Sequence, residues 1–204
     1  MVTNIFVVGL EAFNRRLLER VRGAADYRFH GLLDPHQVAG LGPFDVPAML
    51  AEAHRTLDAF DGPVDALVGF WDFPTQMLLA VLRAERGLRG PTLEAVMRSE
   101  HKYWARLEQH RIDPEVVPAF AAVDPFATDA ARAPPLPYPF WLKPVKAHSS
   151  LLGFRVGGPT DLEQAVAALR RGVHVFADPL AAFMERAELP PGIAETPPHL
   201  CIAE

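Results

Sequence analysis

Residues 139–156 read PFWLKPVKAHSSLLGFRV, and this stretch decides how the second half of the chain is interpreted. Two apolar runs flank a short loop of small and polar residues, which is typical of two antiparallel strands joined by a turn. Alternation along the first strand places Trp141 and Lys143 on one face and Phe140 and Leu142 on the other. A lysine therefore stands in the middle of an otherwise apolar strand.

Two interpretations of Lys143 are open from the residues alone. An unpaired ammonium group inside an apolar run is costly, so Lys143 is either an edge-strand lysine that lies in solvent or a cation that reaches from the sheet toward a phosphate. The loop that follows, residues 147–152, would support the second interpretation, because its backbone N–H groups and the hydroxyls of Ser149 and Ser150 can donate to phosphate oxygens.

The composition is that of an ordinary globular protein. The chain has 204 residues, a formal net charge of −5 and one cysteine, Cys201. A negative balance does not favour nucleic acid or an anionic membrane surface as a partner, and the apolar runs fall short of a membrane span. One cysteine excludes an internal disulfide framework and a cysteine-based zinc site. A cytoplasmic location is expected.

Residues 1–90 alternate between strand-like and helix-like segments. Predicted strands at 4–10, 27–34 and 64–72 are separated by segments with helical spacing of apolar residues, such as Phe13, Leu17 and Val21. Alternation of this kind favours an open, mostly parallel α/β sheet with helices on its faces.

The pattern changes after residue 90. A long helix is predicted over 92–112 with Thr92 as its N-cap, and the proline-rich segment 123–139 is predicted to be a loop. Thr160 and Glu163 predict a capping box for a helix that runs to Gly172. A weaker helix around 178–187 and a final strand in HLCIAE complete an α+β unit. The sequence thus predicts two domains, 1–90 and 91–204.

Several functional classes lack their motifs. The chain has no G-x-x-x-x-G-K-[ST] loop, and VVGLEAFN offers only Gly9 where a dinucleotide fingerprint would lie. No serine sits in a G-x-S-x-G elbow, and the histidines lack metal-ligand spacing. In GFWDFP (69–74), at the end of the third predicted strand, Trp71 and Phe73 are interpreted either as interdomain packing residues or as substrate contacts.

Four short motifs in order resemble the ATP-grasp superfamily, which includes biotin carboxylase, carbamoyl phosphate synthetase and D-alanine–D-alanine ligase. These are EHK with Lys102, FWLKP with Lys143, KAHSSLLGF, and LCIAE with Glu204. The resemblance covers essentially the whole chain. It implies a pre-ATP-grasp α/β domain at 1–90, and a linker helix with the smaller α+β lid subdomain at 91–204.

The resemblance also implies roles for individual residues. Lys102 and Lys143 would neutralise the phosphates of ATP, the loop would form a lid over them, and Glu204 would begin the adenine-binding hinge. Lys146 is an extra cation that shares phosphate contact or faces solvent, and His148 has no assigned role. The cofactor-binding residues predicted in this way are Lys102, Lys143, Lys146, His148, Ser149, Ser150 and Glu204; no catalytic or metal-binding residue is predicted.

The family pattern is matched only in part. Ala147 and His148 stand where many relatives have glycine, which predicts a stiffer loop, and the matched pattern ends at the hinge. The expectation is therefore the N-terminal half of an ATP-dependent carboxylate ligase, which forms an acyl phosphate that an amine captures. Mg²⁺ is expected only in the full-length protein, and no turnover is expected from this chain alone.

Partners and alternatives follow from this expectation. The ligands would be ATP and a small carboxylate, and apolar surface exposed around 195–204 would be covered by a dimer or another partner. The alternative function is a non-catalytic nucleotide-binding or protein-interaction module. An oxidoreductase that uses the first domain to bind NAD has little support.

Overall fold

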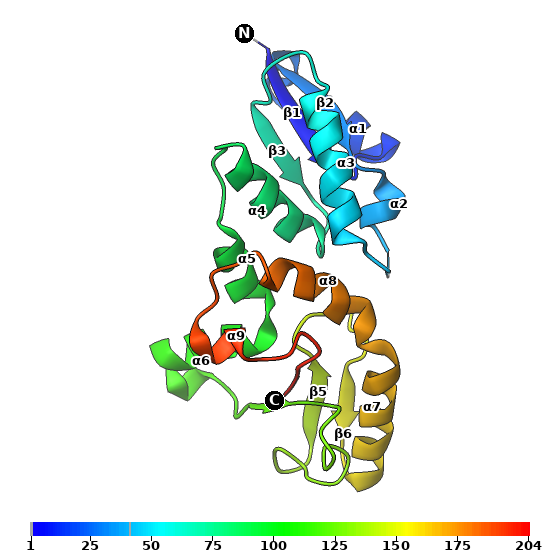
Figure 1. Ribbon diagram of the computed structural model, residues 1–204, viewed down its shortest axis with the longest axis vertical. Coiled ribbons are helices and arrows are strands. Elements are labelled where there is room, and N and C mark those ends of the chain that lie inside the picture. The colour runs from blue at the N-terminus through cyan, green and yellow to red at the C-terminus, as the bar shows by residue number, and fades with distance from the viewer. Residues whose placement is uncertain (1, 41) are drawn as a thin grey trace. The chain divides into compact units, whose positions relative to one another are not determined.

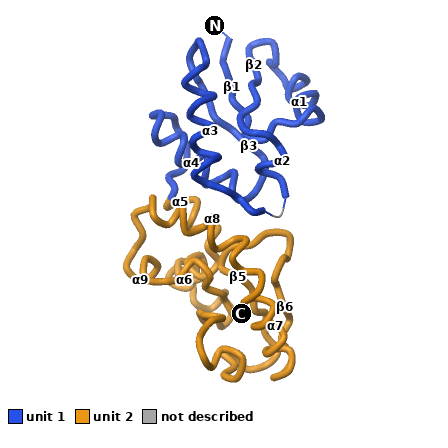
Figure 2. The backbone as a smooth tube through the Cα atoms, turned by 45° about the vertical axis from the view of Figure 1, so that its right-hand side comes forward, with its two compact units in different colours: residues 1–93 blue, residues 94–204 orange. Residues whose placement is uncertain are grey.

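The computed structural model describes residues 2–40 and 42–204. The chain divides into two compact units, Met1–Leu93 and Glu94–Glu204, which Figure 2 shows in different colours. Each unit has its own sheet, and each is described by itself.

The first unit is built on a parallel sheet of three strands in the order β2-β1-β3 (Figure 1). The strands are β1 (Thr3–Val8), β2 (Tyr27–Leu32) and β3 (Ala66–Gly69). Val7 and Val8 of the central strand are buried, as expected where helices cover a parallel sheet. The helices are α1 (Ala12–Leu18), α2 (Pro35–Val38), α3 (Val46–Asp58), α4 (Thr75–Glu85) and the short 3-10 helix η1 (Ala24–Asp26). The predicted parallel α/β sheet is confirmed.

Helix α1 leaves most of its apolar residues exposed. Its apolar residues do recur at helical spacing, yet Phe13 is 60% exposed and Leu17 is 48% exposed. Val21, which lies beyond the end of the helix, is 43% exposed. No residue of α1 is buried. The apolar stripe is therefore real, but it is a surface feature rather than part of the core.

The second unit contains an antiparallel sheet in the order β4-β7-β5-β6. Its strands are β4 (Ala121–Val123), β5 (Phe140–Pro144), β6 (Phe154–Val156) and β7 (Cys201–Ala203). The predicted antiparallel pairing across the loop is confirmed, with Leu142 opposite Phe154. The final strand is also confirmed and pairs with β5. Strand β4 was not predicted.

One face of this sheet carries the core of the unit. Phe140, Leu142 and Val156 pack with Leu162 and Val166 of α7 (Pro159–Gly172). The remaining helices of the unit are α5 (Leu93–Glu100, whose first residue belongs to the first unit), α6 (Lys102–Ile112), α8 (His174–Met184), α9 (Pro191–Ala194) and the 3-10 helix η2 (Pro114–Val116). Helix α8 is longer than the weak helix predicted around 178–187.

The predicted single helix over 92–112 is wrong, because His101 interrupts it and divides it into two helices. This residue has an extended backbone (φ −80°, ψ 98°), and its ring nitrogen Nδ1 accepts a hydrogen bond of 3.2 Å from the backbone N–H of Trp104. His101 thus ends α5 and caps the N-terminus of α6, a role that Ser, Thr, Asp or Asn usually fill.

The predicted capping box of α7 is also wrong. The N-cap is Gly158, which has no side chain, and Pro159 occupies the first turn, where its lack of an N–H group costs nothing. Asp161 instead accepts a hydrogen bond of 2.9 Å from the backbone N–H of Gly157. Thr160 and Glu163 match the motif by spacing, but the helix begins two residues earlier than the motif requires, with Gly158 in place of Thr160 as the N-cap.

The expected apolar exposure at the end of the chain is not observed for the last strand. Leu200 is 5% exposed, and Cys201, Ile202 and Ala203 are fully buried. Burial raises the pKa of the Cys201 thiol to about 12, with a smaller contribution from the charge of Asp124. Strand β7 is therefore an integral core strand that fills the sheet between β4 and β5.

Candidate functional site

Strand β5 has one buried face and one open face. Phe140, Leu142 and Pro144 are buried, while Trp141 is 51% exposed and the Lys143 side chain is 29% exposed. Because β5 lies between β7 and β6, the interpretation of Lys143 as an edge-strand lysine is wrong. The lysine projects from the interior of the sheet, on the face opposite the core.

Glu204 lies between two cations on this face. Its Oε1 is 2.5 Å from Lys143 Nζ, and its Oε2 is 2.6 Å from Nε of Arg106 on α6. The Glu204 side chain is only 11% exposed. Partial burial opposes its ionisation, but the hydrogen bonds and positive charges of Lys143 and Arg106 outweigh burial and hold the pKa of this carboxyl below its usual value. These three side chains form what we call the Glu204 cluster.

The backbone fixes the Glu204 cluster in place. The N–H of Glu204 donates to the carbonyl of Trp141 at 2.9 Å, and the N–H of Trp141 donates to the carbonyl of Glu204 at 2.7 Å. This pair of bonds continues the ladder between β5 and β7 by one step. Arg106 is held as well, because its Nη1 donates to Gln109 Oε1 at 2.6 Å.

Lys102 lies at the first position of α6 and contacts the base of the predicted lid loop. Its backbone N–H donates to Val145 O at 2.8 Å, and its Nζ donates to Ala147 O at 3.0 Å. The helix start and the loop base are therefore joined by two hydrogen bonds from one residue.

Lys146 is buried beside the same junction. It is 4% exposed, and its Nζ lies 2.7 Å from Oε2 of Glu100, the last residue of α5. Of the two alternatives for Lys146, the solvent-facing one is therefore wrong, and phosphate contact remains a prediction. A buried lysine with a carboxylate partner is a strong positional constraint, since removing one partner leaves an uncompensated charge.

His101, between Glu100 and Lys102, is fully buried. Its Nδ1 acts as an acceptor from Trp104, so the neutral ring carries its proton on Nε2, which has no hydrogen-bond partner among the described residues. Burial, with a small contribution from the Lys102 charge, lowers the pKa of His101 to about 4 despite an opposing backbone hydrogen bond. The junction of α5 and α6 therefore contains a neutral histidine next to a buried ion pair.

The loop after Lys146 adopts a tight, irregular turn. Ser149, Ser150 and Leu152 have left-handed backbone conformations with φ of 52°, 58° and 56°, which are unfavourable for residues other than glycine. The carbonyls of His148 and Ser150 accept hydrogen bonds from Leu151 and Gly153 at 3.0 and 3.2 Å. The loop thus has three left-handed residues, and none of them is glycine.

His148 packs at the start of this turn. Its Nδ1 is 3.1 Å from Ser149 Oγ, and its ring lies edge-on to Phe176 of α8, with centroids 5.3 Å apart. His148 therefore contacts both the loop and a helix. Its predicted contact with a nucleotide remains a prediction, as do those of Ser149 and Ser150.

Sequence reasoning missed two residues of the open face. Arg106 lies four residues after Lys102, so both share one side of α6, and this spacing was the available signal. Trp141 stands two residues before Lys143 and therefore on the same face of β5. In the sheet register Trp141 lies opposite Arg155, and both line a pocket of about 510 Å³ with Gly153 and Gln164.

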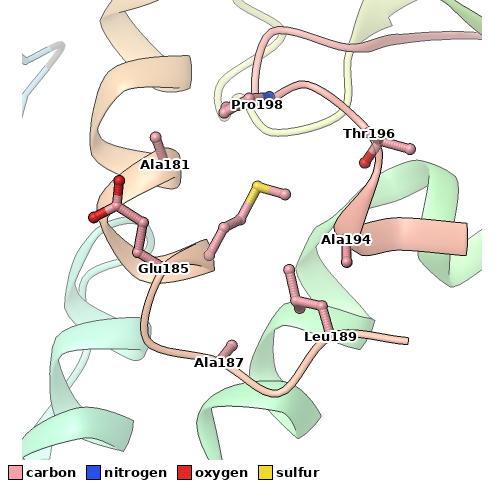
Figure 3. A pocket seen from close by; sticks show the side chains of 8 residues that line it. Ala181, Glu185, Ala187, Leu189, Ala194, Thr196 and Pro198 are labelled. Atoms are coloured by element: carbon pink, nitrogen blue, oxygen red, sulfur yellow. The ribbon is translucent and has the colours of Figure 1, made fainter. Parts of the chain in front are cut away.

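A second hollow in this unit shares none of the predicted site residues. Figure 3 shows a pocket of about 450 Å³ at the C-terminal end of α8. Its lining is mostly apolar, and the Thr196 hydroxyl donates to Ile193 O at 2.7 Å. The residues that line it are Ala181, Met184, Glu185, Ala187, Leu189, Ala194, Thr196 and Pro198.

In the first unit, Trp71 and Phe73 make contacts inside that unit. Trp71 Nε1 donates to Gly9 O at 3.1 Å, and Phe73 is 2% exposed with its ring edge-on to Phe44. The first contact joins the segments that follow β1 and β3, and the second joins the segment after β3 to the segment before α3. Interdomain packing and substrate contact, the two alternatives for these aromatic residues, both remain predictions.

Residues 2–40 and 42–204, the described part of the chain, contain neither a cluster of metal ligands nor a helix that could span a membrane. In this described part of the chain no group of three histidine, cysteine, aspartate or glutamate residues is placed to hold a metal ion. No described helix is both long enough and apolar enough to cross a membrane.

Comparison with known proteins supports the fold. No family model and no curated protein matches the sequence. The L-amino acid ligase from Bacillus licheniformis is 19% identical, with a TM-score of 0.60 over 82% of this chain and 42% of the ligase. Biotin carboxylase from Campylobacter jejuni, solved with β,γ-ATP, is 19% identical, with a TM-score of 0.54 over 88% of this chain and 44% of that protein. D-alanine–D-alanine ligase from Helicobacter pylori is 14% identical, with a TM-score of 0.49.

These neighbours are ATP-grasp enzymes, so the chain is similar in fold to ATP-grasp enzymes. The resemblance read from EHK, FWLKP, KAHSSLLGF and LCIAE is thereby confirmed at the level of the fold. The chain spans less than half the length of the first two neighbours.

Proposed function

We propose that the second unit binds the phosphates of ATP and that the chain is the ATP-binding portion of an ATP-dependent carboxylate ligase. The observation that carries the proposal is the place of Lys143. Lys143 lies on an interior strand, projects away from the core and is 29% exposed, and it shares its partner Glu204 with a second cation, Arg106. This leaves positive charge that an anion can reach, in a fold shared with ATP-grasp enzymes.

The arrangement of charges suits a polyphosphate. The Glu204 cluster contains two cations and one carboxylate, so its formal charge is positive. Lys102 donates to the base of the loop, where a short movement of its side chain would turn the ammonium group toward a bound phosphate. The hydroxyls of Ser149 and Ser150 and the loop amides add uncharged donors.

Trp141 extends the same face toward the base of the nucleotide. Its half-exposed ring lies on the Lys143 side of β5, next to the start of the predicted hinge at Glu204. Aromatic faces stack on nucleobases with useful energy. We propose that this ring contributes to adenine binding.

The expected ligand is Mg-ATP, since divalent metal bridges and neutralises the phosphates in phosphoryl transfer. The described residues offer no cluster of three metal ligands. We therefore assign none of them to the metal and derive no step through it.

The proposed overall reaction follows the kind of ligase among the neighbours. A carboxylate oxygen attacks the γ-phosphorus of ATP and ADP leaves; an amine then attacks the acyl carbon and phosphate leaves. One structural neighbour is an L-amino acid ligase, which makes an amino-acid carboxylate a reasonable substrate class. Because the chain matches only 42% of that neighbour, ligation is proposed for a complete enzyme and not for these residues alone.

A non-catalytic interaction module is the second candidate. It is favoured by the exposed apolar stripe of Phe13, Leu17 and Val21, which the first unit does not cover. Such a module would bind nucleotide or a protein without turnover.

Calorimetric titration with ATP tests the proposed phosphate site, because a module that binds only a protein would bind no ATP. Phosphate binding through Lys143 predicts that Lys143→Gln abolishes ATP affinity and that Lys102→Gln reduces it. Arg111→Gln is the matched control, because Arg111 is a largely exposed cation on the same helix as Lys102. Equal affinity in all three variants would overturn the proposed phosphate site.

A further inference from the structure

We propose that Glu204 is an internal counter-ion, which pairs with Lys143 until a nucleotide phosphate replaces it. Arg106 then keeps the Glu204 carboxylate paired after Lys143 has moved to the phosphate. This inference rests on the proposed function. It assigns Glu204 and Arg106 as positioning residues that set the affinity of the site for phosphate.

The geometry of the Glu204 cluster carries the first step. The two oxygens of the Glu204 carboxylate bind different cations, Oε1 to Lys143 and Oε2 to Arg106. The Lys143 side chain is 29% exposed, whereas the Glu204 side chain is 11% exposed. An incoming anion can therefore reach the lysine from solvent while the carboxylate stays shielded.

Of the three side chains in the Glu204 cluster, the one held least firmly is the one that moves. Glu204 is fixed by two backbone hydrogen bonds to Trp141, and Arg106 is fixed by Gln109. Lys143 has a flexible stem of four methylene groups ending in a single charged group. Exchange of partners is therefore a movement of the lysine, which leaves Oε1 for a phosphate oxygen.

The charge balance explains why Arg106 is needed. A largely buried carboxylate that loses its only cation is strongly destabilised. With Arg106 bound to the other oxygen, Glu204 stays compensated after Lys143 departs. Without Arg106, the carboxylate would hold Lys143 more tightly and compete more strongly with phosphate.

Inorganic tripolyphosphate is the right probe, because it has no adenine and so bypasses the predicted role of Glu204 at the hinge. Its affinity for the 204-residue chain is measured by calorimetry at fixed low salt, without metal. We expect Glu204→Gln to tighten binding by roughly three- to tenfold and Arg106→Gln to weaken it by about tenfold, the range typical of single partly buried charge pairs.

The double variant Arg106→Gln/Glu204→Gln gives the sharpest result. The loss caused by Arg106→Gln is expected to disappear when Glu204 is already neutral, and Arg106→Lys is expected to restore most of the binding. An equal loss in both backgrounds would mean that Arg106 binds phosphate directly and would overturn its role as a counter-cation. Arg111→Gln again serves as the matched control.

Failure of this inference is distinguishable from failure of the proposed function. If wild-type chain binds tripolyphosphate through Lys143 but Glu204→Gln binds no more tightly, only the counter-ion role is wrong. If neither wild type nor Glu204→Gln binds ATP or tripolyphosphate, both proposals fail. Thermal melting checks that each variant is folded; should Glu204→Gln not fold, Glu204→Asp, whose shorter side chain draws back from Lys143, is expected to tighten binding instead.

Discussion

Acid sensitivity of the junction between α5 and α6 is the prediction that follows most directly from His101. The ring is fully buried and neutral, with a pKa of about 4 against an ordinary value of 6.5. The unfolded chain therefore takes up a proton below pH 6.5 that the folded chain resists down to about pH 4. Because the unfolded state binds more protons in this window, the free energy of unfolding falls as the pH is lowered through it.

The magnitude follows from the same values. The difference between the pKa of His101 in the unfolded and the folded chain corresponds to a loss of about 3 kcal/mol in the free energy of unfolding between pH 6.5 and pH 4, at about 1.4 kcal/mol per pKa unit. His101→Asn removes the titrating ring and keeps a side-chain acceptor suited to the N-cap of α6. We expect the variant to lose about 3 kcal/mol less than wild type over this pH range, whatever its stability at pH 7.

The assay is urea unfolding at several pH values, followed by tryptophan fluorescence. Trp71 is the only tryptophan of the first unit, so a Trp71→Phe background restricts the signal to Trp104 and Trp141 of the second unit. His174→Asn, an exposed histidine on α8, is the matched control and should keep the wild-type pH dependence. The same pH slope in wild type and His101→Asn would refute the reasoning.

Three further predictions concern stability. Gly9→Ala should destabilise the first unit by at least about 1–2 kcal/mol in urea unfolding, because φ is +65° and an added Cβ would lie 2.4 Å from a Val38 methyl; an unchanged midpoint would contradict this. Lys146→Met should cost about 3 kcal/mol and Lys146→Met/Glu100→Leu distinctly less, since the pair is buried; equal losses would show that the pair is not coupled. Phe13→Ser should change stability by no more than about 0.5 kcal/mol, because the ring is 60% exposed; a loss above 2 kcal/mol would mean that the ring is buried in solution.

Much of the fold could be predicted because its strands are short apolar runs. In some of them buried and exposed side chains alternate, and in others nearly every residue is apolar. The alternation around Lys143 correctly separated the core face of β5 from its open face. The runs at 4–10 and 64–72 became strands of a parallel sheet because helices follow each of them. The pattern of apolar residues was enough to predict these strands, because burial of those residues is what fixes them.

The errors arose where a competing local interaction prevailed. Helix-forming residues flank His101 on both sides, so nothing in the periodicity marked the break that its own ring stabilises by capping α6. Pro159 at the first turn overrode the capping box at Thr160. The helical spacing of Phe13 and Leu17 predicted a helix, but spacing alone does not show whether a neighbour exists to cover its apolar face.

The candidate site was predictable only as separate pieces. Lys143 and Glu204 are 61 positions apart, and Arg106 and Glu204 are 98 positions apart. No local pattern joins such residues, and only the pairing of β7 with β5 brings Glu204 beside Lys143. The motifs named the lysines and Glu204 as separate residues, and the pairing of Glu204 with Lys143 follows from the sheet topology.

The most direct test of the account is the affinity of the chain for ATP, measured by calorimetry for wild type and Lys143→Gln. Wild type is expected to bind ATP, Lys143→Gln to show no detectable binding, and the control Arg111→Gln to bind as wild type does. Binding by Lys143→Gln with wild-type affinity would contradict the central claim that this interior lysine holds the phosphates.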